Sequence, residues 1–276
     1  MAAMAGLPVN FQSAMQSAGE VLYRIADNVS TAPFLRERHA LPTAIPIGTR
    51  VVDTVDDLTA FTGLPRETVM RELRLRRGVS FRAEWFATPR RLRRDHWFYL
   101  SSKAYLFANA SHSNDAFIRD FLAAQLDESD RVLEFGGGTG DLALRLAAAG
   151  IATTYVELNA LQREFVRFRV ARHGLGGMIA VRAHWEPIET GAFDAVIAMD
   201  VIEHLPNARD VLAGTLLPAL RDDAVLVENS PFEVNAWNPM HHDDFGFERF
   251  MRDSRFEVVA QHTDNTRAWR RQSAGI

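Results

Sequence analysis

One short segment constrains this chain more than any other, because an apolar run ends in glycines and a helical pattern follows at once. The segment is Val132–Asp141, with the sequence VLEFGGGTGD. Glycines permit a tight turn and let a bound ligand approach the backbone closely. A strand, a glycine loop and a helix in this order are typical of the first half of a parallel β–α–β unit. The segment therefore predicts an α/β fold with a ligand-binding loop.

The pattern of strand followed by helix continues from about Asp130 to the C-terminal end. We expect strands at Arg131–Phe135, Ala152–Glu157, Met178–Arg182, Phe193–Met199 and Ala224–Asn229, and helices at Asp141–Ala149, Ala160–His173, Ala208–Leu220 and Asp244–Asp253. Phe256–His262 and Thr266–Arg271 predict a terminal antiparallel pair around a Thr-Asp-Asn turn. This alternation predicts a doubly wound, mostly parallel seven-stranded α/β sheet.

The first part of the chain lacks this alternation. Helical patterns occur at Gln12–Asp27, Val55–Thr62, Arg66–Arg77 and Asp115–Gln125. We therefore predict an N-terminal helical cap domain over residues 1–125 and a ligand-binding α/β domain over residues 126–276. The stretch Asp57–Leu73 has the spacing of a helix-turn-helix, so DNA binding stays open beside the interpretation as a lid or dimerisation platform.

Composition excludes several classes of protein. The 276 residues include no cysteine, which excludes disulfides, a cysteine nucleophile and thiolate-bound metal or iron–sulfur sites. No apolar run approaches the roughly 20 residues of a membrane span. The N-terminal segment has no basic region and no long apolar stretch, so we expect no secretory signal and a cytoplasmic location. A formal net charge of -4 argues against nucleic acid as the main partner.

The glycine loop by itself has two interpretations. The sequence GTGDLA at Gly138–Ala143 fits the dinucleotide fingerprint GxGxxA, and Glu157 follows at the distance of a ribose-binding acid. However, the carboxylate of Glu134, just ahead of the glycines, would repel a pyrophosphate. It would attract a ligand that carries ammonium and sulfonium groups.

With this acid ahead of its glycines, the loop resembles the first motif of the class I S-adenosylmethionine-dependent methyltransferases. Phe193–Leu205, with the sequence FDAVIAMDVIEHL, is similar to the fourth strand of that family and its exit loop. The resemblance covers roughly Asp130 to Arg271, about half of the chain. It implies a Rossmann-like methyltransferase fold with S-adenosylmethionine as the cofactor.

The resemblance also implies which residues hold the cofactor. An acid at the position of Glu157 accepts hydrogen bonds from both ribose hydroxyls. His184 stands where the family often has an adenine-binding Asp, and Trp185 is interpreted either as a ring that stacks on the purine or as a core aromatic. The predicted cofactor-binding residues are Glu134, Gly136, Gly138, Gly140, Glu157, Leu158, His184, Trp185 and Asp200.

Methyl transfer requires a positioned acceptor and the removal of its proton. His204, just after the fourth strand, is the first candidate for the base. Tyr99 and Tyr105 lie where the family commonly has a lid, and we expect them near the sulfonium, with an aromatic stripe packed on the sheet as the alternative. In Asn238–Asp244, adjacent residues rarely converge on one ion, so we predict substrate contact, or helix capping by Asp243, and no metal.

The predicted function is S-adenosylmethionine-dependent methyl transfer to a small metabolite. An enzyme of the same fold could instead consume the cofactor as its substrate and release methylthioadenosine. An NAD-dependent oxidoreductase and a cofactor-sensing DNA-binding protein are the alternatives from other classes. We expect a small-molecule substrate, no nucleic acid and no membrane as partners, and a homodimer stays open, as does the identity of the acceptor.

Glu157→Ala tests the assignment of the ribose-binding acid. We expect the substitution to weaken S-adenosylmethionine binding by about 1–3 kcal/mol, because two ligand hydroxyls would lose their acceptor. Isothermal titration calorimetry measures this difference. An unchanged affinity would remove Glu157 from the predicted site.

Overall fold

The computed structural model describes residues 45–47, 50–76, 84–90, 97–102, 104–110, 121–122, 124–128, 130–235 and 238–272. The helix predicted at Gln12–Asp27 lies outside the described residues, as does most of the helix predicted at Asp115–Gln125. The division into a cap domain and an α/β domain at residues 125 and 126 stays a prediction.

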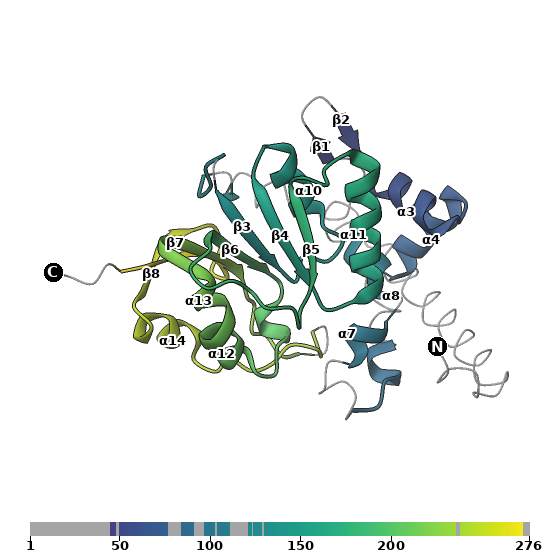
Figure 1. Ribbon diagram of the computed structural model, residues 1–276. Helices are drawn as coiled ribbons and strands as arrows, with labels where there is room; N and C mark the ends of the chain where they lie inside the picture. The colour runs from purple at the N-terminus through teal and green to yellow at the C-terminus, as the bar shows by residue number, and fades with distance from the viewer. Residues whose placement is uncertain are drawn as a thin grey trace.

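A seven-stranded sheet forms the centre of the structure (Figure 1). Its strands are β3 (Arg131–Phe135), β4 (Ala152–Glu157), β5 (Ile179–Ala183), β6 (Phe193–Met199), β7 (Leu220–Asn229), β8 (Phe256–Gln261) and β9 (Thr266–Arg271). The order is β5-β4-β3-β6-β7-β9-β8, and only the pairs that contain β9 are antiparallel. The predicted mostly parallel α/β sheet is confirmed. Because the strand order reverses between β3 and β6, ligands are expected at the carboxyl ends of these strands.

Helices cover both faces of this sheet. On one face lie α10 (Asp141–Ala148) and α11 (Ala160–His173), and on the other lie α12 (Ala208–Val211), the π-helical turn η2 (Leu212–Leu216), α13 (Leu217–Ala219) and α14 (Phe247–Asp253). Side chains of β3 alternate between the two layers, since Val132 packs with Leu146 of α10 while Leu133 packs with Leu212 of η2. Among the described helices, none has the length and apolarity needed to cross a membrane.

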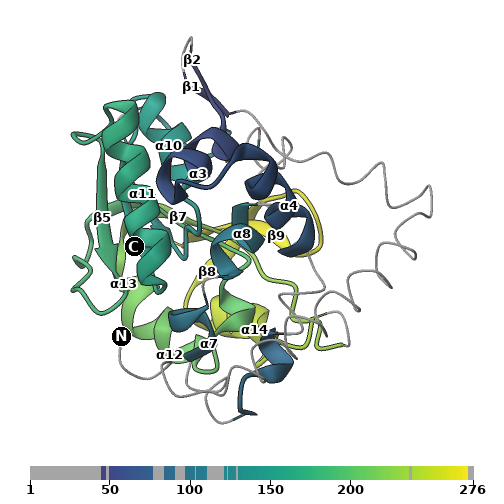
Figure 2. The same ribbon diagram turned by 90° about the vertical axis from the view of Figure 1, so that its right-hand side faces the viewer.

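The described residues of the N-terminal part include a small hairpin and several helical segments. The hairpin pairs β1 (Ile45–Ile47) with β2 (Arg50–Val52), and the helices are α3 (Thr54–Thr62), α4 (Arg66–Arg76), α7 (Trp97–Ser101) and α8 (Ala104–Ala110). Figure 2 shows α3, α4 and α8 gathered next to α11. Apolar side chains from all three helices, such as Leu58, Leu73 and Leu106, form one cluster with Phe165 of α11. The predicted helix-turn-helix is therefore a packed helical pair.

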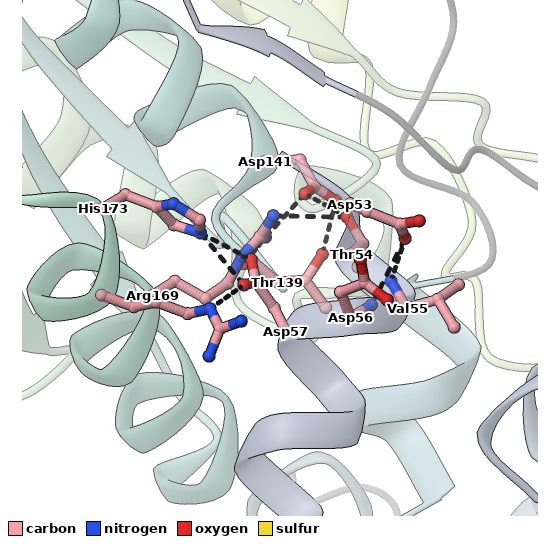
Figure 3. A network of polar contacts seen from close by, with 10 residues as sticks. Asp53, Thr54, Val55, Asp56, Asp57, Thr139, Asp141, Arg169 and His173 are labelled. Atoms are coloured by element: carbon pink, nitrogen blue, oxygen red, sulfur yellow. Dashed lines mark hydrogen bonds and ion pairs between the residues drawn. The ribbon is translucent and has the colours of Figure 1, made fainter. Parts of the chain in front are cut away.

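A buried ionic network joins α3 to the glycine loop and to α11 (Figure 3). The side chain of Arg169 on α11 is 0% exposed. Its Nε donates to Asp57 Oδ2 over 2.9 Å, and its Nη1 donates to Asp141 Oδ1 over 2.6 Å and to the Thr139 carbonyl over 2.7 Å. Thr54 Oγ1 donates to the same oxygen of Asp141 over 3.1 Å. The network ties residues from both halves of the chain to the loop after β3.

Arg169→Met tests how much stability this network provides. The substitution keeps the length of the side chain but removes the cation of the buried Asp141 and leaves Asp57 with Arg172 and His173 only, among the described residues. We therefore expect a loss of about 3–5 kcal/mol of unfolding free energy. Urea denaturation followed by circular dichroism measures it. The control is Arg66→Met, because Arg66 pairs with Asp53 and Asp56 at the surface of α3 and its loss should shift the midpoint far less. Equal shifts for the two variants would contradict the prediction.

Candidate functional site

A cavity of about 360 Å³ opens at the carboxyl ends of the parallel strands, where the strand order reverses. Gly136 follows β3, Glu157 ends β4, His184 follows β5, and Asp200 follows β6, and each of them lines the wall. The volume lies in the range typical of small-molecule sites. The chain topology therefore places one concave site where an α/β sheet of this kind binds its ligand.

Many of the residues predicted from the sequence line this one cavity. Of the predicted cofactor-binding residues, Gly136, Glu157, Leu158, His184 and Asp200 form part of its wall. The three predicted catalytic residues, Tyr99, Tyr105 and His204, also line it. Glu134, Gly138, Gly140 and Trp185 are not part of the wall. The individual roles of all these residues stay predictions.

Glu157 connects the glycine loop to the end of β4. Its Oε2 accepts a hydrogen bond from the Gly138 N–H over 3.0 Å, and its Oε1 accepts one from the Asn159 N–H over 2.9 Å. Burial raises the pKa of this carboxyl, while the same backbone donors act in the opposite direction. A carboxylate has about four acceptor positions, so each oxygen keeps capacity for a ligand hydroxyl. This geometry fits the predicted contact with a ribose.

Two glycines of the loop are required by the packing of the chain itself. A Cβ at Gly136 would overlap the side chain of Val201, and one at Gly138 would lie 3.0 Å from Asn109 Nδ2 on α8. Both glycines have a positive φ, +75° and +56°. From the sequence, we expected these glycines to let a ligand approach the backbone. In the structure, Asn109 of α8 also packs against Gly138.

Glu134 lies beneath the glycine loop. It points to the α10 side of the sheet, and a Cβ at Gly137 would approach its carboxyl carbon to 2.6 Å. Burial, followed by the charge of Asp141, raises its pKa well above the usual value. Its Oε2 has no hydrogen-bond partner among the described residues. Glu134 is therefore not part of the cavity wall, and its predicted attraction of a cationic ligand stays a prediction.

Trp185 is 65% exposed, so its interpretation as a core aromatic is wrong. The physical reason is the position of β5 at the edge of the sheet, where no further strand covers the residues that follow it. The guanidinium of Arg163 lies 4.9 Å from the centre of its ring, and Nη1 of the same arginine donates to the Leu158 carbonyl over 2.7 Å. The ring of His184 lies 4.9 Å away, so Trp185 adjoins a residue of the cavity wall.

His204 and Tyr99 form a hydrogen-bonded pair in the wall. Tyr99 Oη lies 2.9 Å from His204 Nδ1, and the Met240 carbonyl lies 3.4 Å from the same nitrogen. Burial raises the pKa of Tyr99, so its hydroxyl keeps its proton. Burial, and secondly the neighbouring His241, lowers the pKa of His204 to about 3. Because an effective base has a pKa near the working pH, this neutral imidazole is a weak proton acceptor.

Asn159 holds the segment that carries both tyrosines. Its Oδ1 accepts hydrogen bonds from the Leu161 and Gln162 N–H groups over 2.9 Å and 3.1 Å, which caps α11. Its Nδ2 donates to the Tyr99 carbonyl over 2.7 Å and to the Ser102 carbonyl over 3.1 Å. Sequence reasoning missed this residue, although an asparagine just before a predicted helix is a recognised start signal.

The tyrosine segment belongs to an aromatic cluster, and its predicted position near the sulfonium stays a prediction. The rings of Tyr99 and Tyr105 lie 5.2 Å apart, and they pack with Trp85 and Phe98 in one aromatic cluster. Both tyrosines nevertheless line the cavity. The segment is thus a packed aromatic stripe that also forms a wall of the site.

One expectation for the segment after β7 needs correction, and a buried acid of β7 lies outside the site. Asp244, and not Asp243, accepts hydrogen bonds from the Gly246 and Phe247 N–H groups, so α14 begins at Phe247. Glu228, near the end of β7, is fully buried and is not part of the cavity wall. Its Oε1 accepts from Trp269 Nε1 over 3.0 Å and from an arginine of β9.

The remaining wall comes from residues that no motif marked. Asn207, Val211 and Thr215 line the cavity from the start of α12 to the turn η2. The π-helical geometry of η2 is a feature that often accompanies functional sites. No local pattern in the sequence predicts this π-helical turn.

These features define an α/β protein with a small-molecule site at the switch point of its sheet. A family model described as a methyltransferase domain matches residues 107–260, which is more than half of the chain. The chain belongs to this family. The resemblance to class I S-adenosylmethionine-dependent methyltransferases is thereby confirmed.

Individual relatives match shorter stretches. A ubiquinone biosynthesis O-methyltransferase of Xanthomonas oryzae pv. oryzae is 35% identical over 101 residues, which cover 34% of this chain and 40% of the relative. Tuberculostearic acid methyltransferase UfaA1 of Mycobacterium tuberculosis is 32% identical over 80 residues, or 29% of this chain and 19% of the relative. The chain thus spans less than half the length of these curated relatives.

Among solved structures, geranyl diphosphate methyltransferase in complex with S-adenosylmethionine is 19% identical to this chain, with a TM-score of 0.47. The match covers 58% of this chain and 73% of that protein.

Asn159→Asp tests whether this side chain holds the tyrosine segment. An aspartate keeps the cap of α11 but cannot donate to the carbonyls of Tyr99 and Ser102, so we expect a loss of about 1–3 kcal/mol in stability. Hydrogen exchange should become faster over residues 97–102. Asn207→Asp is the matched control, since Asn207 precedes α12 without a side-chain capping bond. Unchanged exchange in Asn159→Asp would contradict the assignment.

Proposed function

We propose that this chain transfers a methyl group from S-adenosylmethionine to a hydroxyl group of a small-molecule acceptor. The observation that carries the proposal is the cavity at the switch point of the sheet, with the buried carboxylate of Glu157 in its wall. Family membership supports the reaction class, and the cavity supports a compact ligand.

The residues of the cavity fit this cofactor. When bound, S-adenosylmethionine supplies a methyl group activated by a sulfonium. Glu157 would accept hydrogen bonds from the ribose hydroxyls, and His184, just after β5, would face the adenine ring of the cofactor. Leu158 supplies apolar wall beside them. These assignments use residues from neighbouring strand ends, as binding sites at a switch point do.

Asp200 is held in a conformation that points to a role in binding. It has a φ of 54°, which is uncommon for a residue other than glycine. Its N–H donates to the Asn229 carbonyl over 2.9 Å, and its Oδ1 accepts from the side-chain amide of the same residue. Such strained positions cluster at binding sites, where surrounding contacts hold them in place.

Tyr99, Tyr105 and His204 form the side of the cavity that we assign to the acceptor and the sulfonium. Aromatic faces attract a cationic centre, and burial keeps the hydroxyl groups of both tyrosines protonated by raising their pKa. These protonated hydroxyls would orient an acceptor by hydrogen bonding. The aromatic cluster behind them would exclude water from the reacting groups.

Hydroxyl acceptance is the finer part of the proposal. It is supported by the similarity of part of the chain to a ubiquinone biosynthesis O-methyltransferase. The methyltransferase family offers no support for the nicotinamide alternative. Consumption of S-adenosylmethionine without methyl transfer is an outcome that the following experiment distinguishes.

Mass spectrometry of the small-molecule products tests the proposal. With S-adenosylmethionine alone, we expect the cofactor to stay intact, and with a panel of phenols, catechols and hydroxy acids we expect S-adenosylhomocysteine and a methylated acceptor. Glu157→Ala should reduce product formation, whereas Glu189→Ala, at an exposed position outside the cavity, should not. Methylthioadenosine in the absence of an acceptor would contradict methyl transfer.

A further inference from the structure

Three metal-ligating side chains from two segments meet beside the cavity. Glu203 and His204 belong to the 3-10 helical turn η1 (Ile202–His204) after β6, and His241 comes from the loop after β7. One ligand atom from each residue lies within 4.8 Å of the other two. The two imidazole rings are 4.7 Å apart between centroids and nearly perpendicular.

Three polar atoms of this cluster lack hydrogen-bond partners among the described residues. Glu203 is 0% exposed, and neither of its carboxyl oxygens has a hydrogen-bond partner among the described residues. Nδ1 of His241 is likewise buried without such a partner. Buried polar atoms are nearly always hydrogen-bonded, and an unpaired group calls for a missing partner such as an ion. Here three unpaired atoms lie in one cluster.

The surrounding charges favour a cation at this position. The charges that act on Glu203 include those of Asp200 and Glu228. Both groups are carboxyls, so the field at Glu203 is negative when they are ionised.

Contacts outside the cluster hold its members in position. The His242 N–H donates to the Glu203 carbonyl over 2.7 Å, which fixes the loop after β7 to the turn η1. Tyr99 Oη and the Met240 carbonyl both lie near Nδ1 of His204. Outer contacts of this kind orient histidine ligands in metal sites.

We propose that Glu203, His204 and His241 bind a divalent transition-metal ion at the wall of the cavity. Two imidazoles and one carboxylate suit Zn²⁺, Fe²⁺, Mn²⁺ or Co²⁺, and three protein ligands leave positions open for a small molecule. Because His204 lines the cavity, an open position would face the bound acceptor. The site goes beyond methyl transfer and its geometry does not depend on that function.

This proposal revises the expectation of no metal. From the sequence, only the adjacent residues of Asn238–Asp244 were candidates, and adjacent residues rarely converge on one ion. The structure brings just one of them, His241, to two residues of a different segment. Because His204 and His241 are far apart in the sequence, their proximity could not be predicted from spacing.

Titration with Co²⁺ tests the site. The full chain, freed of metal with a chelator and dialysed, should bind one equivalent of Co²⁺ per chain and acquire visible d–d absorption. Glu203→Gln and His241→Ala should each weaken binding by about 10-fold or more. His242→Ala is the matched control, because its neighbouring imidazole is not a member of the cluster, and its affinity should stay within about 3-fold of the original chain.

The outcomes separate this proposal from the proposed function. Circular dichroism confirms folding of each variant, and His241→Ala, in a loop, serves if Glu203→Gln does not fold. Absence of saturable Co²⁺ binding, or equal affinity in His241→Ala and His242→Ala, would overturn the metal site whatever the methyl-transfer assay shows. Cluster-dependent Co²⁺ binding without methylated product would instead uphold the metal site and contradict only the proposed function.

Discussion

A single buried guanidinium, that of Arg169, connects the N-terminal helix α3 to the glycine loop after β3. Arg169 on α11 binds Asp57 of α3, Asp141 of α10 and the carbonyl of Thr139 in the glycine loop. Removing charged groups from water costs several kcal/mol unless each finds a partner. The same guanidinium thus stabilises both the docking of α3 and the loop after β3. The N-terminal region also contributes Tyr99 and Tyr105 to the cavity wall.

The sheet could be predicted closely because each strand is an apolar run bounded by turn residues. The bounds predicted for Arg131–Phe135, Ala152–Glu157, Phe193–Met199 and Thr266–Arg271 agree with β3, β4, β6 and β9. Elements whose ends depend on packing were less predictable. The helix from Ala208 is interrupted by a π-helical turn, and β7 already begins at Leu220.

The candidate site was likewise predictable from the sequence only in part. Residues at strand ends, such as Glu157, Asp200 and His204, could be placed together because parallel strands end at one edge of the sheet. Sequence could not show which side of the sheet Glu134 faces, nor that Trp185 follows an uncovered edge strand. It also could not join His241 to Glu203, since their contact arises from the fold of two separate loops.

Burial determines the protonation states of Tyr99, Tyr105 and His204, which line the cavity. It lowers the pKa of His204 to about 3 and keeps the hydroxyls of Tyr99 and Tyr105 protonated. None of these three groups is therefore a strong base at neutral pH. The same neutrality makes His204 a suitable ligand for a cation, and a cation would lower the pKa of a bound hydroxyl. If the proposed methyl transfer to a hydroxyl and the metal site both hold, His204 would therefore contribute as a metal ligand rather than as the base itself.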